Sequence, residues 1–387
     1  MSSSGRRLPG LLGVSDVEFA VVSNPGTPDR LAAIAGTGPS PLPHLAESAR
    51  LVERLGAAHL AYPCNTAHYF LWRATPEQLP LHVPLVDMIH ETVDAVVCAG
   101  HRVVGLLAAT GTTTTGLYQD ALAARGVTTL VPETARQLGF APMTDERGHV
   151  RPEAYRAYGV EPGEALGDAA FETFATDLVR QLGEQDGLVM EAIVGGAGVK
   201  AGYRSGLVPQ LLNEAARRLA ARGAQALVLG CSEVPLVLTG TCATYGGRPV
   251  DLLDPTSVPA ACLLARAGRH GIAGGLGPEA TIDLQVKMGA PRDFTDLQYA
   301  VLRQTVRQLG ARRDQDHLML LGLAGPDPVE AARALARAGA AFLALTESAS
   351  GAADAVAAAT GLPIVAAGSD QQTGAEVVRR AAEHAIA

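Results

Sequence analysis

Two of the five cysteines stand directly after short apolar segments and are followed by small polar residues. Cys64 lies in residues 62–68 (YPCNTAH), and Cys231 lies in residues 229–235 (LGCSEVP). A cysteine in polar surroundings can act as a nucleophile or as an acid and base, and a helix N-terminus or a nearby cation lowers its pKa. Ligand sites of open parallel sheets gather at the carboxyl ends of the strands. We therefore predict that Cys64 and Cys231 face one cleft.

The other three cysteines, Cys98, Cys242 and Cys262, lack this context, and we expect them to be small buried hydrophobes. An odd number of widely spaced cysteines does not fit a disulfide framework, and no C-x-x-C pair indicates structural zinc. We accordingly expect no metal site. Free thiols fit a reducing compartment, so the sequence predicts a cytoplasmic protein.

The composition favours a packed protein that acts on a small molecule. A chain of 387 residues predicts two or three domains, and 48% hydrophobic with 18% charged residues is typical of globular folds. The net charge of -8, without a long run of lysine and arginine, disfavours nucleic-acid binding. No apolar stretch reaches the roughly 20 residues of a membrane span, and the N-terminal residues lack the apolar core of a secretory signal. We expect neither nucleic acid nor a membrane as a partner.

Short apolar runs alternate with segments of helical periodicity, which predicts an α/β fold with parallel sheets and right-handed crossovers. Strands are expected at residues 17–24, 57–63, 103–108, 226–230, 271–275, 317–323, 341–346 and 363–368. Helices are expected at residues 45–56, 169–182 and 208–223.

The two cysteine motifs together resemble those of the aspartate/glutamate racemase superfamily. The likeness covers roughly residues 15–265. Four further segments carry it: residues 24–30 (NPGTPDR), 105–112 (GLLAATGT), 199–202 (VKAG) and 253–256 (LDPT). Glu233 stands where the glutamate branch typically has histidine, so the aspartate racemase branch is closer. That branch usually has threonine at Ser232, a change that keeps the hydroxyl group.

The resemblance implies an isomerase that needs no cofactor and inverts Cα of a small acidic amino acid, with aspartate favoured. One cysteine thiolate removes the Cα proton while the thiol on the opposite face returns one. Fixed donors must neutralise the substrate carboxylates. The implied binding residues are Asn65, Thr66 and Ser232 for the α-carboxylate, Arg30 and Lys200 for the second carboxylate, and His68 and Glu233 for orienting the thiols or holding the ammonium group.

The C-terminal tail departs from this family. Aspartate racemases normally begin with a strand that ends in a glycine-rich loop, whereas this chain carries such a loop at residues 274–281 (GGLGPEAT). Gly275 and Gly277 are therefore predicted to line the site. The tail also repeats the order helix, strand, turn and strand seen near Cys64, with residues 346–349 (TESA) in place of residues 63–66 (PCNT). Two interpretations of the tail compete: it is a degenerate copy of the first lobe, or a permuted piece that completes the sheet of that lobe. Both hold if the tail docks at an open edge of the lobe or of a dimer partner.

The predicted architecture is two pseudo-symmetric parallel-sheet lobes of the racemase fold and a C-terminal α/β half-domain. Residues 1–100 and 210–265 are assigned to the first lobe, 101–209 to the second, and 266–387 to the half-domain. The resemblance allows a homodimer. Two other functions stay open: an enzyme on the same scaffold that isomerises maleate or decarboxylates activated acids, and a non-catalytic ligand-binding relative.

Overall fold

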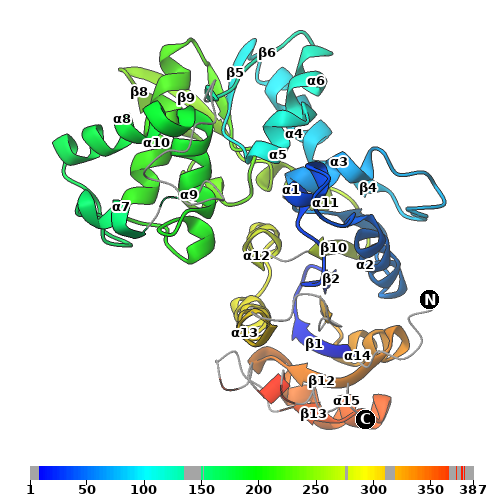
Figure 1. Cartoon of the computed structure of the whole chain (residues 1–387). Coiled ribbons are helices and arrows are strands. Elements are labelled where there is room, and N and C mark those ends of the chain that lie inside the picture. The colour runs from blue at the N-terminus through cyan, green and yellow to red at the C-terminus, as the bar shows by residue number, and fades with distance from the viewer. Residues whose placement is uncertain are drawn as a thin grey trace. The chain divides into compact units, whose positions relative to one another are not determined.

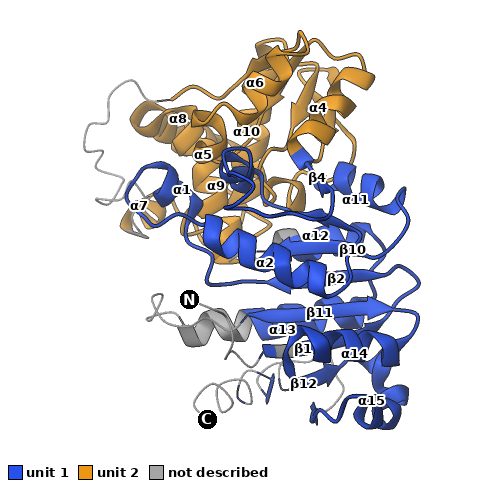
Figure 2. Cartoon of the chain, turned by 90° about the vertical axis from the view of Figure 1, so that its right-hand side faces the viewer, with its two compact units in different colours: residues 1–88, 256–387 blue, residues 89–255 orange. Residues whose placement is uncertain are grey.

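Figure 1 shows a computed structural model of the chain. It describes residues 8–134, 150, 152–274, 278–309, 319–365, 372, 376–377 and 379. The chain forms two compact units, coloured separately in Figure 2: unit 1 comprises Met1–Met88 and Thr256–Ala387, and unit 2 comprises Ile89–Pro255. Each unit contains one mainly parallel sheet with helices, which confirms the predicted α/β class.

Unit 1 is built on an eight-stranded sheet in the order β13-β12-β1-β11-β2-β10-β3-β4. Its strands are β1 (Leu8–Val14), β2 (Phe19–Ser23), β3 (His59–Ala61), β4 (Leu85–Val86), β10 (His270–Gly274), β11 (Leu320–Gly325), β12 (Ala340–Leu345) and β13 (Ile364–Val365). Every neighbouring pair is parallel except β11 and β2, which run antiparallel.

The antiparallel pair divides this sheet into two halves with the same strand order. The half β2-β10-β3-β4 matches the half β11-β1-β12-β13, and Val21 lies opposite Gly322 at the junction. The register matches as well, because Ile272 of β10 lies opposite Ala61 of β3, as Leu11 of β1 lies opposite Ala344 of β12. The two halves are therefore related by a pseudo-twofold through the β2–β11 junction.

The two halves exchange their central strands along the sequence. β10 comes from the tail, yet it lies between β2 and β3 of the N-terminal half. β1 comes from the N-terminus, yet it lies between β11 and β12 of the tail half, as Figure 2 shows. The strand that the N-terminal segment lacks is thus supplied by the tail.

Helices cover both faces of the sheet in unit 1. On one face, α2 (Leu42–Arg54), α14 (Pro328–Ala338) and α15 (Ala353–Thr360) bury apolar residues against the strands. On the other face lie α11 (Ser257–Leu264), α12 (Pro278–Lys287) and α13 (Arg292–Leu309). The strands are buried on both sides, which explains their near-continuous apolar sequences. Two short helices, α1 (Arg30–Ile34) and α3 (His68–Leu71), follow β2 and β3.

Helix α14 shows how the local sequence sets these elements. Its apolar face comprises Ala331, Leu335 and Ala338, at helical spacing, and Asp327 caps its start by accepting hydrogen bonds from the first-turn N–H groups. Gly339 ends the helix with a φ of 103°, a conformation that favours glycine.

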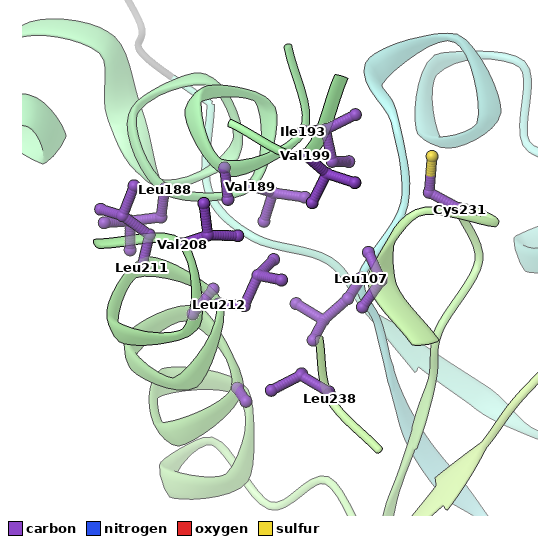
Figure 3. Close-up of a cluster of buried hydrophobic side chains, with 14 of the residues drawn as sticks. Leu107, Leu188, Val189, Ile193, Val199, Val208, Leu211, Leu212, Cys231 and Leu238 are labelled. Carbon is purple, nitrogen blue, oxygen red and sulfur yellow. The ribbon is translucent and has the colours of Figure 1, made fainter. Parts of the chain in front are cut away.

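Unit 2 has a five-stranded sheet in the order β6-β5-β7-β9-β8. Its strands are β5 (Val103–Leu106), β6 (Thr128–Leu130), β7 (Ala226–Val228), β8 (Cys242–Tyr245) and β9 (Arg248–Leu253). Its helices are α4 (Met88–Cys98), which begins at the unit boundary, α5 (Thr110–Thr114), α6 (Leu117–Ala123), α7 (Pro152–Ala157), α8 (Asp168–Glu184), α9 (Glu191–Val194) and α10 (Leu207–Ala221). Short helical segments are η2 (Gln185–Met190), η3 (Val199–Ala201) and η4 (Val234–Leu236). Figure 3 shows α10 packing Val208, Leu211 and Leu212 into the core of this unit.

The observed division differs from the predicted one. Residues 210–265 were assigned to the first lobe, but β7 and β9 pair in the sheet of β5, so α10 and these strands belong to unit 2. Two predictions of buried thiols are wrong: Cys98 at the end of α4 and Cys242 on edge strand β8 are exposed, while Cys262 is half-buried. The described part of the chain contains no helix long and apolar enough to cross a membrane.

Candidate functional site

In unit 1, Cys64 follows strand β3 and starts a helical turn. It is extended, with φ -148° and ψ 108°, and precedes the short helix η1 (Asn65–Ala67). The N–H of Ala67 donates to the carbonyl of Cys64 at 3.2 Å. The side chain of Cys64 is half-buried, and Asn65 is buried. Cys64 therefore stands at a strand end, where the first N–H groups of a helical turn favour negative charge.

The fully buried His68 holds the backbone of Cys64 rather than its thiol. Its Nδ1 donates to the carbonyl oxygen of Cys64 at 3.0 Å, and its Nε2 lies 3.9 Å from Oδ1 of Asp87. The indole Nε1 of Trp72 donates to Oδ2 of the same carboxylate at 2.5 Å. This network fixes the start of the turn and so orients Cys64.

A second loop of unit 1 follows β2 and carries Arg30. Asp29 caps α1 by accepting from the N–H of Ala32, and the guanidinium of Arg30 donates to the carbonyl of Pro28 at 3.2 Å. At the start of this loop the N–H of the buried Asn24 donates to the carbonyl of Gly274, the last residue of β10. Asn24 was not singled out in the sequence; its Nδ2 has no hydrogen-bond partner within the described residues. The feature that marks Asn24 is its side-chain amide, which is buried just after the end of strand β2.

Strand β10 reaches the same edge of the sheet as Cys64. Helix α12 packs closely on its end, because a Cβ on Gly274 would lie 2.2 Å from Oγ1 of Thr281. Gly275 and Gly277, the predicted lining glycines, lie outside the described residues.

In unit 2, Cys231 follows strand β7 and is buried at the edge of the core cluster in Figure 3. Its thiol donates to Oε2 of Glu233 at 2.9 Å, and the hydroxyl of Ser232 donates to the same oxygen at 3.1 Å. Nζ of Lys200 lies 3.7 Å from Oε1 of Glu233. Cys231, Ser232, Glu233 and Lys200 thus form one hydrogen-bonded and charged cluster.

The electrostatics of this cluster favour a protonated thiol and an ionised carboxylate. Burial raises the pKa of Cys231, Glu233 raises it further, and Lys200 opposes the shift. Burial would raise the pKa of Glu233, but Lys200 and the hydrogen bonds from Cys231 and Ser232 outweigh it, so this pKa is lowered. Glu233 is consequently an ionised acceptor for the thiol proton.

Close packing explains the glycine before Cys231. A Cβ on Gly230 would lie 2.7 Å from Cδ1 of Leu106 on β5 and 3.1 Å from the Cβ of Ala108. Glycine therefore lets the end of β7 approach its neighbour and places Cys231 at the strand end.

The family comparison bears on the N-terminal part of the chain. Residues 3–172 match the family model described as Asp/Glu/Hydantoin racemase. This segment of the chain is similar to that racemase family. The matched segment contains Arg30, Cys64, Asn65, Thr66 and His68.

Several solved racemases are similar to the chain at low identity. An aspartate racemase from Picrophilus torridus is 15% identical, with coverage of 67% of this chain and 94% of that chain and a TM-score of 0.38. A glutamate racemase from Francisella tularensis subsp. tularensis SCHU S4, in complex with D-glutamate, is 12% identical, with coverage of 74% and 94% and a TM-score of 0.37. Identities and TM-scores this low indicate neither the substrate nor the mechanism of this chain.

Each unit therefore presents one cysteine shortly after a parallel strand. Unit 1 brings Cys64 together with Asn65, Thr66 and His68, and the short helix α1, which begins at Arg30, contacts η1. Among the described residues, no group of three or more His, Cys, Asp or Glu side chains is arranged to hold a metal ion.

Proposed function

We propose that the protein is a cofactor-independent racemase of a small acidic amino acid, with aspartate favoured, and that Cys64 and Cys231 exchange protons with opposite faces of its Cα. One observation carries this proposal. In each unit a cysteine follows the end of a parallel strand, and the thiol of Cys231 is hydrogen-bonded to the ionised carboxylate of Glu233. The match of residues 3–172 to the Asp/Glu/Hydantoin racemase family model supports the reaction class.

Cys231 is the proton donor of the resting protein. Its thiol is protonated, because burial and Glu233 raise its pKa. When it gives its proton to Cα, a thiolate remains beside the Glu233 carboxylate, and the ammonium of Lys200, 3.7 Å from Oε1, offsets the repulsion. Lys200 and Glu233 thus allow Cys231 to give up a proton in one direction of the reaction and to accept one in the other.

Cys64 is the proton acceptor for the first direction. The hydrogen bond from His68 to its carbonyl keeps its backbone in place. The Cα proton passes to the Cys64 sulfur as the Cys231 proton passes to the other face, so the number of protons is conserved. The reverse reaction starts from the exchanged protonation states.

The substrate carboxylates bind to fixed donors. The α-carboxylate binds to Asn65 and Thr66, and to the Ser232 hydroxyl once its proton turns away from Glu233; binding there stabilises the charge that develops at Cα. Arg30 is the cation for the second carboxylate.

The test is incubation with L-aspartate in heavy water, followed by mass spectrometry and chiral chromatography. We expect deuterium at Cα together with formation of D-aspartate. Cys64→Ala and Cys231→Ala should each abolish racemisation, whereas Cys98→Ala, at an exposed thiol, should not. Full racemisation by either site variant, or isomerisation of maleate without any exchange at Cα of aspartate, would overturn the proposal.

A further inference from the structure

Glu191 is a buried carboxyl group that the reaction above does not use. It opens helix α9, and only 5% of its surface is exposed. The N–H of Val150 donates to its carboxylate. Its Oε1 has no hydrogen-bond partner in the described part of the chain. A buried polar atom without a partner is costly, so this carboxyl group calls for a functional explanation.

The backbone after Glu191 leads directly to Lys200. The carbonyl of Glu191 accepts from the N–H of Gly195 at 3.0 Å, and the carbonyl of Gly195 accepts from Gly198 at 2.9 Å. The carbonyl of Gly198 then accepts from Ala201 at 3.1 Å, which closes η3 around Lys200. Three successive backbone turns therefore join the main chain of Glu191 to the short helix η3 that carries Lys200.

The carboxyl group packs on the backbone of these turns without an intervening side chain. A Cβ on Gly195 would lie 2.0 Å from Oε1 of Glu191. A Cβ on Gly198 would lie 2.8 Å from the carbonyl oxygen of Ala192. Residues 195–198 (GGAG), which we name the glycine turn, therefore lie with Gly195 directly against the Glu191 carboxylate and with Gly198 against the backbone of α9.

We propose that Glu191 is a positioning residue: its carboxyl group fixes the glycine turn, which places Lys200 against Glu233 and so sets the reactivity of the Cys231 thiol. The link to catalysis rests on the function proposed above. The link to thiol reactivity rests on the contacts alone.

The electrostatic setting makes this device sensitive to pH. Burial raises the pKa of Glu191 to about 8, and the hydrogen bond from Val150 lowers it only in part. Charged groups on the elements that pack against α9 are bound elsewhere: Asp186 of η2 by Thr110, Lys200 of η3 by Glu233, and Glu214 of α10 by Arg217 and Arg218. Tyr155, whose ring lies near Gly196, adds an uncharged hydroxyl. Above pH 8, Glu191 therefore carries a buried charge without a counter-ion among these groups, and the glycine turn must shift.

The experiment measures the rate at which iodoacetamide alkylates Cys231, read by mass spectrometry of its peptide, from pH 6 to pH 10. In the natural protein, we expect the contact between Lys200 and Glu233 to be lost above pH 8. The alkylation rate should then rise less with pH than the titration of a single thiol would give. Glu191→Gln removes the titration and should give a rate about threefold higher at pH 9, which corresponds to roughly half a pKa unit, with equal rates at pH 6. Glu172→Gln, at an exposed carboxyl of α8, is the matched control and should behave as the natural protein.

A second variant keeps the proposal testable if Glu191→Gln folds poorly. Lys200→Ala removes the group that the glycine turn is proposed to place, so its pH profile should lack the break near pH 8. Identical profiles in the natural protein and Glu191→Gln, or a break that persists in Lys200→Ala, would overturn the proposal. If the alkylation profiles differ as expected but no racemisation occurs, the proposed function fails and the positioning role stands.

Discussion

Replacing Gly271 by alanine is expected to destabilise unit 1 more than any comparable glycine change in its sheet. Gly271 lies in the middle of β10, opposite Leu60 of β3 and Ala20 of β2. A Cβ built there would lie 2.2 Å from Cγ1 of Val52 and 2.7 Å from the carbonyl oxygen of His59. One of these contacts is a stiff branched side chain of α2, and the other is backbone.

The expected magnitude follows from those distances. Overpacking a core position costs about 1–3 kcal/mol, and rigid neighbours place the cost in the upper part of that range, so we expect a loss of about 3 kcal/mol. Gly10 on β1 provides a graded comparison, because its Cβ would meet the flexible end of Leu343 at 2.7 Å and should cost about 1–2 kcal/mol. Gly351, with nothing within 4 Å of its Cβ, should tolerate alanine within about 0.5 kcal/mol.

The assay is urea unfolding of the full chain followed by tryptophan fluorescence. The single tryptophan, Trp72, lies in unit 1 and reports on that unit. The order of midpoints should be Gly351→Ala, then Gly10→Ala, then Gly271→Ala as the lowest. If Gly271→Ala unfolds at the same urea concentration as Gly351→Ala, then β10 does not lie between β2 and β3, and the strand exchange described here is wrong.

Three further changes test other parts of the structure. Glu233→Gln should speed alkylation of Cys231 at pH 7, because the carboxylate raises the pKa of this thiol; a slower reaction would contradict that electrostatic account. Asp293→Ala should destabilise the protein by roughly 1–2 kcal/mol, since its carboxylate accepts from the N–H of Ser348 at 2.9 Å. Burial would raise the pKa of Asp293, but hydrogen bonds from Ser348 and Thr346 outweigh it, so this pKa is lowered. The contribution is therefore present above the ordinary pKa and is lost as the pH falls through the lowered value, and urea unfolding should show a smaller deficit of the variant at pH 3 than at pH 7. Deleting residues 270–387 should leave a protein without a cooperative unfolding transition in unit 1, and a stable truncated protein would refute this dependence.

The elements with strong apolar periodicity were predictable from the sequence. Each of the eight expected strands coincides with an observed one, and the three expected helices correspond to α2, α8 and α10. The placement of Cys64 and Cys231 after strands follows from the same signal, since an apolar run that ends in small polar residues marks a strand end. Whether the predicted binding residues act on a substrate stays a prediction.

The features that escaped prediction depend on contacts between distant residues. The segment of β1 contains Pro9 and two glycines, which weaken a strand signal, and it becomes a strand because β11 and β12 flank it. The antiparallel junction of β2 and β11 joins residues about 300 positions apart, and no local pattern reports strand direction. Glu191 resembles any carboxylate on a helix in the sequence, and only its burial reveals its position.

The exchange of β1 and β10 has a consequence for synthesis of the chain. β2, β3 and β4 leave the ribosome with the place between β2 and β3 vacant, because β10 begins only at His270. Between these events the ribosome produces the whole of unit 2, residues 89–255. Unit 2 is contiguous and can fold as it emerges, whereas the sheet of unit 1 closes last, through pairings of high sequence separation. The strand end at Cys64 is consequently assembled only after the tail has been made, and the facing edges of β2 and β3 stay unpaired until then.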